Sequence, residues 1–185
     1  DLLPENVLDI WHYGFTDMFN NAIDHSGGTE ISVHIKKTAA NTEMVLLDNG
    51  IGIFKKIQAQ LNLLDERHAI LELSKGKLTT DPKRHTGEGI FFTSRMFDSF
   101  DILSGGVFFS HAFGKPEDCV DPVCREMHII GSLCDAKIFS PASAASRKDS
   151  PVSFERFKSA EKVVNVCFDF CIVFICLLDE CSIKF

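Results

Sequence analysis

Two polar residues near the start of the chain have the types and the spacing needed to handle a phosphorylated ligand. Asp17 and Asn21 stand four residues apart in a segment with helical spacing, so their side chains are expected on one helix face. A carboxylate beside an amide oxygen suits a hydrated Mg²⁺ with its attached phosphates. The carboxylate can instead orient or deprotonate an attacking hydroxyl or water. A solvated helix face would show the same pair, because Asp and Asn side chains are mostly exposed.

A second candidate site follows an apolar run, where the sequence reads Asp48-Asn49-Gly50-Ile51-Gly52. A carboxylate at the end of a strand can accept a hydrogen bond from an exocyclic amine, such as that of adenine. The glycines allow the backbone to pass close to a flat ring. The same residues also suit a plain turn, for which Asp-Asn-Gly is a common sequence.

A third candidate site is the segment His85-Thr86-Gly87-Glu88-Gly89. Glycines that lead directly into a helix leave backbone N–H groups free at the positive end of the helix dipole, where a phosphate can bind. The segment is not a P-loop, because no Gly-Lys followed by Ser or Thr is present. Each segment alone is weak evidence, whereas the three in this order and spacing are much stronger.

Together the three segments resemble the N, G1 and G2 boxes of the GHKL superfamily. This superfamily includes gyrase-type topoisomerases, heat-shock chaperones, mismatch-repair ATPases, sensor histidine kinases and anti-sigma-factor serine kinases. The resemblance covers about residues 5–135 and is closest to stand-alone bacterial ATP-binding domains related to the serine kinases. It implies the Bergerat fold, an α+β two-layer sandwich. Its sheet is mixed but mostly antiparallel, with helices on one face and a long ATP lid.

The resemblance also implies roles for individual residues, with ATP and Mg²⁺ as cofactors. Asn21 matches the asparagine that ligates Mg²⁺, and Asp17 matches the carboxylate, normally Glu, that acts as base or polariser. His25 matches a position beside the adenine, and Asp48 matches the adenine-binding aspartate. The remaining nucleotide-binding candidates are the glycines of G1, the residues of G2 and two lysines of the lid, residues 74–86: Gly50, Gly52, Thr86, Gly87, Glu88, Gly89, Lys75 and Lys77.

Hydrophobic periodicity predicts the elements that must position these residues. Three- and four-residue spacings predict a helix over 5–25, which Ser26-Gly27-Gly28 ends. Alternation predicts an antiparallel hairpin of strands 30–36 and 43–48. The segments that follow are predicted to be two helical pieces over 54–73, a loop over 74–87 and a helix over 88–98. After them we expect a hairpin of 100–103 with 107–113 and a strand over 128–133. This order favours helices layered on one face of an antiparallel sheet.

Composition limits the classes of partner and compartment. The chain has 185 residues and a formal net charge of −7, which argues against nucleic acid as the main partner. Its seven cysteines, from Cys119 onward, include no Cys-x-x-Cys pair, so a zinc site is disfavoured and free thiols in the cytoplasm are expected. The longest apolar run, 170–178, is too short for a membrane helix of about 20 residues.

The predicted organisation is an ATP-binding domain over 1–139, then a linker and C-terminal segment of unknown role over 140–185. The start at Asp1, without Met or a signal peptide, reads as a chain cut partway. We expect the Mg-ATP-binding domain of a bacterial regulatory kinase or ATPase, acting by hydrolysis or by phosphotransfer to a STAS-like or response-regulator-like protein. The alternatives are a non-catalytic ATP-binding switch, an inactive fragment, or a histidine-kinase ATP-binding domain without its dimerisation and phosphoacceptor part.

Overall fold

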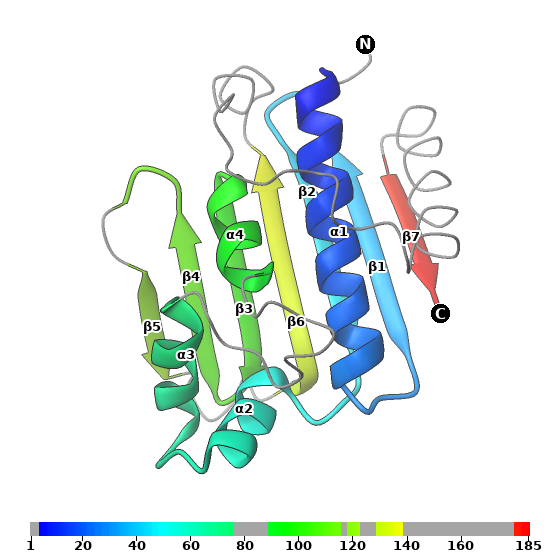
Figure 1. The fold of residues 1–185 in the computed structure, drawn as a ribbon. Coiled ribbons are helices and arrows are strands. Elements are labelled where there is room, and N and C mark those ends of the chain that lie inside the picture. Colours follow the sequence, from blue (N-terminus) through cyan, green and yellow to red (C-terminus); the bar gives the residue numbers. More distant parts are fainter. Residues whose placement is uncertain (1–3, 76–88, 116–117, 123–128, 139–179) are drawn as a thin grey trace.

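The computed structural model describes residues 4–75, 89–115, 118–122, 129–138 and 180–185. Within them, four helices lie on one face of an open seven-stranded sheet (Figure 1). The helices are α1 (Glu5–His25), α2 (Ile53–Leu61), α3 (Glu66–Ser74) and α4 (Gly89–Met96). The strands are β1 (Ile31–Lys37), β2 (Thr42–Asp48), β3 (Ser99–Gly105), β4 (Val107–Ala112), β5 (Cys119–Pro122), β6 (Ile129–Ile138) and β7 (Glu180–Lys184). The chain is therefore an α+β protein.

The longest helix, α1, follows the predicted periodicity over its full length. Its apolar positions form one buried stripe, which includes Val7, Ile10, Phe15, Met18, Phe19 and Ala22. Near the middle of the stripe the Trp11 ring meets the Phe97 ring edge-on, with 4.8 Å between centroids. The helix ends at His25, and Gly27 takes a positive φ of 66° just beyond it. Burial of this stripe against the sheet places the C-terminal turn of α1 beside the end of β2.

The sheet has the strand order β5-β4-β3-β6-β2-β1-β7. The two predicted hairpins are present: β1 pairs with β2, with Ile31 opposite Asp48, and β3 pairs with β4. A positive φ of 58° at Gly105 lets the chain turn between β3 and β4. Every strand pair among the described residues is antiparallel, so the expectation of a mixed sheet was wrong for this part of the chain.

The buried core lies between the helices and the sheet. Side chains alternate along β1, β2 and β3, so that one set from each of these strands packs under the helices: Val33, Ile35, Met44, Leu46, Phe100 and Ile102. Helix α1 contacts β2, and α4 contacts both β3 and β4. These contacts fix the ends of α1, β2 and α4 relative to one another, and the candidate site is built from those ends.

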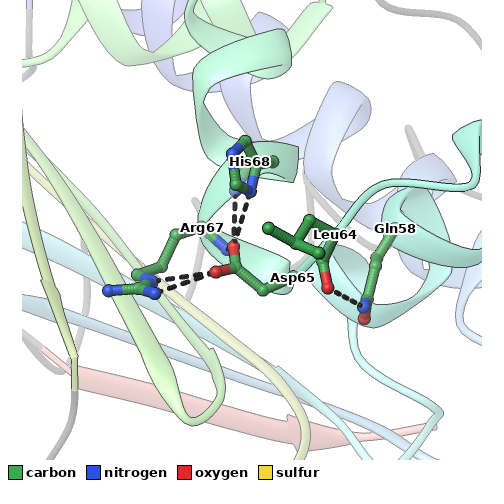
Figure 2. A network of polar contacts seen from close by, with 5 residues as sticks. All are labelled: Gln58, Leu64, Asp65, Arg67 and His68. Carbon is green, nitrogen blue, oxygen red and sulfur yellow. Dashed lines mark hydrogen bonds and ion pairs between the residues drawn. The ribbon is translucent and has the colours of Figure 1, made fainter.

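Two helices fill the segment 54–73, as predicted, and Asp65 separates them. Asp65 Oδ1 accepts hydrogen bonds from the backbone N–H groups of Arg67, at 2.9 Å, and His68, at 3.1 Å, and so caps α3. The side chains of Arg67 and His68 also donate to this carboxylate, as Figure 2 shows. Gln58 of α2 donates to the carbonyl of Leu64. The α2–α3 turn is therefore held by short-range contacts.

Two strands were not predicted from the sequence. Strand β5 has only four residues and ends at Pro122, and β7 is a short edge strand that pairs with β1. Strand β5 is too short to show alternation, whereas β7 does alternate, with Cys181 and Ile183 between polar neighbours, so its pattern was a usable signal. Because β7 pairs with β1, the end of the predicted C-terminal segment belongs to the same sheet, while the predicted boundary at 139/140 lies outside the described residues. None of the described helices is long and apolar enough to cross a bilayer.

Candidate nucleotide site

A concave pocket that opens to solvent lies between the C-terminal half of α1 and the sheet. Its walls also include the first residues of α2 and α4. Three residues predicted to bind nucleotide line it: Asn21 and His25 from α1, and Asp48 from the end of β2. The remaining wall is mainly apolar: Met18, Ala22, Ser26, Leu46, Ile53, Ile90, Ile102 and Cys134. Two of the three predicted boxes therefore meet in one concave and largely apolar site.

The carboxylate of Asp48 is buried, with 5% of the residue exposed. One of its oxygens, Oδ1, accepts a hydrogen bond from the backbone N–H of Gly50 at 2.8 Å. This contact is the Asx turn that the plain-turn interpretation expects, and it also holds the carboxylate in one orientation within the pocket. Both interpretations of the segment thus apply to the same residue.

The loop after Asp48 packs tightly against the end of α1. A Cβ at Gly50 would lie 2.3 Å from the backbone oxygen of Ser26, and that oxygen accepts a hydrogen bond from the N–H of Ile51 at 2.9 Å. Asn49 Oδ1 accepts from the N–H groups of Thr29, at 2.8 Å, and Glu30. Here the small residue at 50 is needed for the approach to a helix end, whereas the sequence alone predicted that the glycines make room for a flat ring.

Asp17 sits at the contact between α1 and α4, one helical turn before Asn21. Its Oδ2 accepts a hydrogen bond from Thr93 Oγ1 at 3.0 Å. Its Oδ1 lies where a Cβ on Gly89 would be only 2.3 Å away, so the missing side chain of Gly89 makes room for the carboxylate. Burial raises the pKa of Asp17 to about 6, and the hydrogen bond from Thr93 opposes that rise. A carboxyl group with such a pKa can accept a proton near neutral pH.

Lys56 of α2 is part of the site's surroundings and was not singled out from the sequence. Its Nζ donates to the carbonyl oxygen of His25 at 2.7 Å and lies 3.5 Å from His25 Nδ1. A cation at this point stabilises the C-terminal end of α1, where the helix dipole is negative. Burial lowers the pKa of Lys56, and the nearby charge of Asp24 opposes that change. The partners are 31 residues apart, so no local pattern could have indicated the contact.

The other predicted site residues fall into two groups. Gly52, with a φ of 88°, is the N-cap of α2, and Gly89 is the first residue of α4. Lys75 follows α3, where it forms an ion pair with Glu72 and does not line the pocket. The rest of the lid and of the third box lies outside the described residues: Lys77, Thr86, Gly87 and Glu88.

The described residues hold no group of three or more His, Cys, Asp or Glu side chains arranged for a metal ion. A Mg²⁺ ion bound with a nucleotide does not need such a group, because it keeps several waters and takes one or two protein ligands plus phosphate oxygens. The amide oxygen of Asn21, at the pocket wall, is a suitable protein ligand for an ion of this kind.

Comparison with known proteins adds no family assignment. No protein-family model matches the chain, and no curated protein matches its sequence. The interpretation of the pocket therefore depends on the residues themselves and on their geometry.

Proposed function

We propose that this protein binds Mg-ATP in the pocket between α1 and the sheet, with the Bergerat arrangement of an ATP-binding domain. The observation that carries the proposal is the buried carboxylate of Asp48 in a largely apolar pocket whose α1 wall presents Asn21 and His25. Three separate segments of the chain were expected to bind one nucleotide. Residues from two of them line this single pocket, and the third leads into α4 beside it.

The chemistry of the pocket fits an adenine base. A carboxylate accepts a hydrogen bond from the exocyclic amine of adenine, and the Asx turn at Gly50 keeps that acceptor in place. Leu46 and Ile102 supply apolar surface against which a flat ring can pack. Guanine carries a carbonyl group where adenine carries the amine, so the carboxylate would repel it. ATP should therefore bind more tightly than GTP.

The phosphates are assigned to the side where α1 and α4 approach each other. Asn21 lines the pocket there, and Gly89 and Ile90 begin α4, whose N-terminal dipole favours an anion. We assign to Asn21 the role of Mg²⁺ ligand. The ion would neutralise phosphate charge and so make the terminal phosphorus easier to attack.

The proposed activity is ATP hydrolysis or phosphotransfer to a STAS-like or response-regulator-like protein, in a bacterial regulatory role. In that reaction the oxygen of water or of a protein hydroxyl forms a bond to the γ-phosphorus. The bond from the γ-phosphorus to the bridging oxygen breaks, and that oxygen leaves on ADP with the electron pair. The carboxylate of Asp17 takes the proton of the attacking group.

A non-catalytic ATP switch is the second candidate. It is favoured by one observation: Asp17 does not line the pocket, and one of its oxygens is already bonded to Thr93. Both candidates require ATP binding, and they differ in whether ADP is released.

Calorimetric titration with Mg-ATP tests the binding that both candidates share. We expect micromolar affinity for ATP and weaker binding of GTP. Asp48→Asn should weaken ATP binding about tenfold or more, because the amide presents a donor toward the adenine amine. Asp101→Asn on β3, away from the pocket, is the matched control and should bind as the wild type does. Equal affinity in Asp48→Asn and the wild type would contradict the proposal.

A further inference from the structure

Thr93 is completely buried in α4 and uses both branches of its side chain against α1. Its hydroxyl donates to Asp17 Oδ2 at 3.0 Å. Its methyl group faces Gly14, where a Cβ would lie 3.5 Å from Thr93 Cγ2. A β-branched residue has few χ1 rotamers, so packing of the methyl group against α1 also fixes the direction of the hydroxyl.

The carboxyl group of Asp17 is thereby held at one oxygen and lies close to Gly89 with the other. Oδ2 is bonded to Thr93, and Oδ1 lies against the bare Cα of Gly89, the residue at which the third predicted box enters α4. Movement of the carboxyl group would break the hydrogen bond to Thr93, and a side chain at position 89 would collide with the carboxyl group where it now lies. The contact thus directs one carboxylate oxygen toward the start of α4, the side assigned to the phosphates.

We propose that Thr93 is a positioning residue, which holds the carboxylate of Asp17 in the orientation needed to receive a proton during ATP turnover. This inference rests on the proposed function. Thr93 touches neither nucleotide nor Mg²⁺ in this account, and it acts through Asp17 alone. Its hydroxyl also favours the ionised form of the carboxylate, because it donates to that form. Among the described residues, burial and this hydrogen bond are the influences on the Asp17 pKa, and no charged group contributes.

Two substitutions separate the hydroxyl of Thr93 from its shape. Thr93→Val keeps the branched shape and removes the donor, whereas Thr93→Ser keeps the donor and removes the methyl group. The measurements are kcat for ADP release as a function of pH, and the Kd for Mg-ATP by calorimetry. Thr93→Val should lower kcat about tenfold or more and move the acidic limb of the pH profile upward by about one unit, because the Asp17 pKa rises without its donor. Thr93→Ser should retain most of the activity, and Kd should stay within about twofold in both variants.

If the hydroxyl of Thr93 contributes only to the stability of the fold, the expected result is different. Thr93→Val would then lower the melting temperature without moving the acidic limb, and this outcome would overturn the inference. Should Thr93→Val not fold, Thr93→Ser and Thr93→Ala form a second pair that differs only in the hydroxyl, and equal pH profiles in that pair would overturn it as well.

The experiment also separates failure of the inference from failure of the proposed function. Lack of ATP binding in the wild type would contradict both. Binding without ADP release, both alone and with a STAS-like or response-regulator-like acceptor present, would overturn the positioning role and leave the ATP switch standing. Binding with release, and with identical pH profiles for the wild type and Thr93→Val, would overturn the inference alone.

Discussion

The loops before α2 and before α3 contain the same kind of turn, closed by an aspartate side chain, but the two turns have different surroundings. Each contains an aspartate whose Oδ1 accepts the backbone N–H two residues further on: Asp48 from Gly50, and Asp65 from Arg67. The first carboxylate is buried in the wall of a pocket, while the second remains partly exposed at a helix N-terminus. What differs is the long-range packing: α1 closes over the first loop, and the second is held by its own neighbours.

The two regions also differ in how the pKa of a carboxyl group is shifted. Asp65 has hydrogen-bond donors within three residues, and the donors of Arg67 and His68 hold its pKa well below the usual range. Near the pocket, burial raises the pKa of Asp17 to about 6, and its hydrogen-bond donor comes from 76 residues away. A carboxyl group perturbed by burial beside a concave site is a candidate for proton transfer, whereas one perturbed by local donors is a cap.

The largest effect that would test this contrast is expected at Gly50. Gly50→Ala places a Cβ 2.3 Å from the backbone oxygen of Ser26, which cannot move without disturbing the end of α1. We expect a loss of about 3 kcal/mol in the free energy of unfolding, together with weaker ATP binding. Gly27→Ala is the control: nothing lies within 4 Å of its Cβ, and its φ of 66° should cost only about 1 kcal/mol. Equal losses would show that the loop is not held by this approach.

A smaller effect is expected from Asp17→Asn, which removes a partly buried charge and keeps a hydrogen-bond acceptor for Thr93. The folded-state pKa of Asp17 is raised above its unfolded value, so the ionised group makes the folded state less stable as the pH rises from about 4 to about 6. The variant should therefore be more stable than the wild type by about 2 kcal/mol at pH 7.5, and the difference should vanish near pH 4. Urea unfolding at both pH values measures this. A variant less stable than the wild type at pH 7.5 would contradict the account.

The smallest effect is expected at the cap of α3. Asp65→Ala should lower the melting temperature by about 2–4 °C, the scale for loss of one helix cap in a chain of this size. The sign of its pH dependence is opposite to that of Asp17. Because the folded-state pKa of Asp65 is lowered, its stabilisation is present at neutral pH and is lost only as the pH falls through that low pKa. ATP binding should be unchanged, and weaker ATP binding in Asp65→Ala would remove the functional distinction between the two regions.

The elements set by short-range patterns could be predicted from the sequence. The stripe of α1, the β1–β2 alternation and the break at Asp65 each lie within one segment and appear in the structure with nearly the expected bounds. Strand β5 could not be predicted, because what makes it a strand is pairing with β4, whereas the alternation of Cys181 and Ile183 with polar residues indicates β7. The four residues of β5 supply little apolar alternation of their own.

The residues of the candidate site also fall into those that the sequence could indicate and those that it could not. Asp17, Asn21 and Asp48 could be selected from residue type and spacing, since each lies in a short recognisable segment, and His25 was selected only through the resemblance. Thr93 and Lys56 could not be selected, because their roles come from contacts across 76 and 31 residues. The candidate residues could thus be selected locally, whereas the contacts around them depend on how α1, α2 and α4 pack.

Backbone amide shifts followed by NMR during an Mg-ATP titration test the central claim most directly. The account predicts that the largest changes map to the walls of the pocket, at Asn21, His25, Asp48 and Ile90. The amides of Arg67 and His68, in the α2–α3 turn, should stay within experimental error. Changes centred on the α2–α3 turn, or no change at millimolar Mg-ATP, would contradict the assignment of this pocket to ATP.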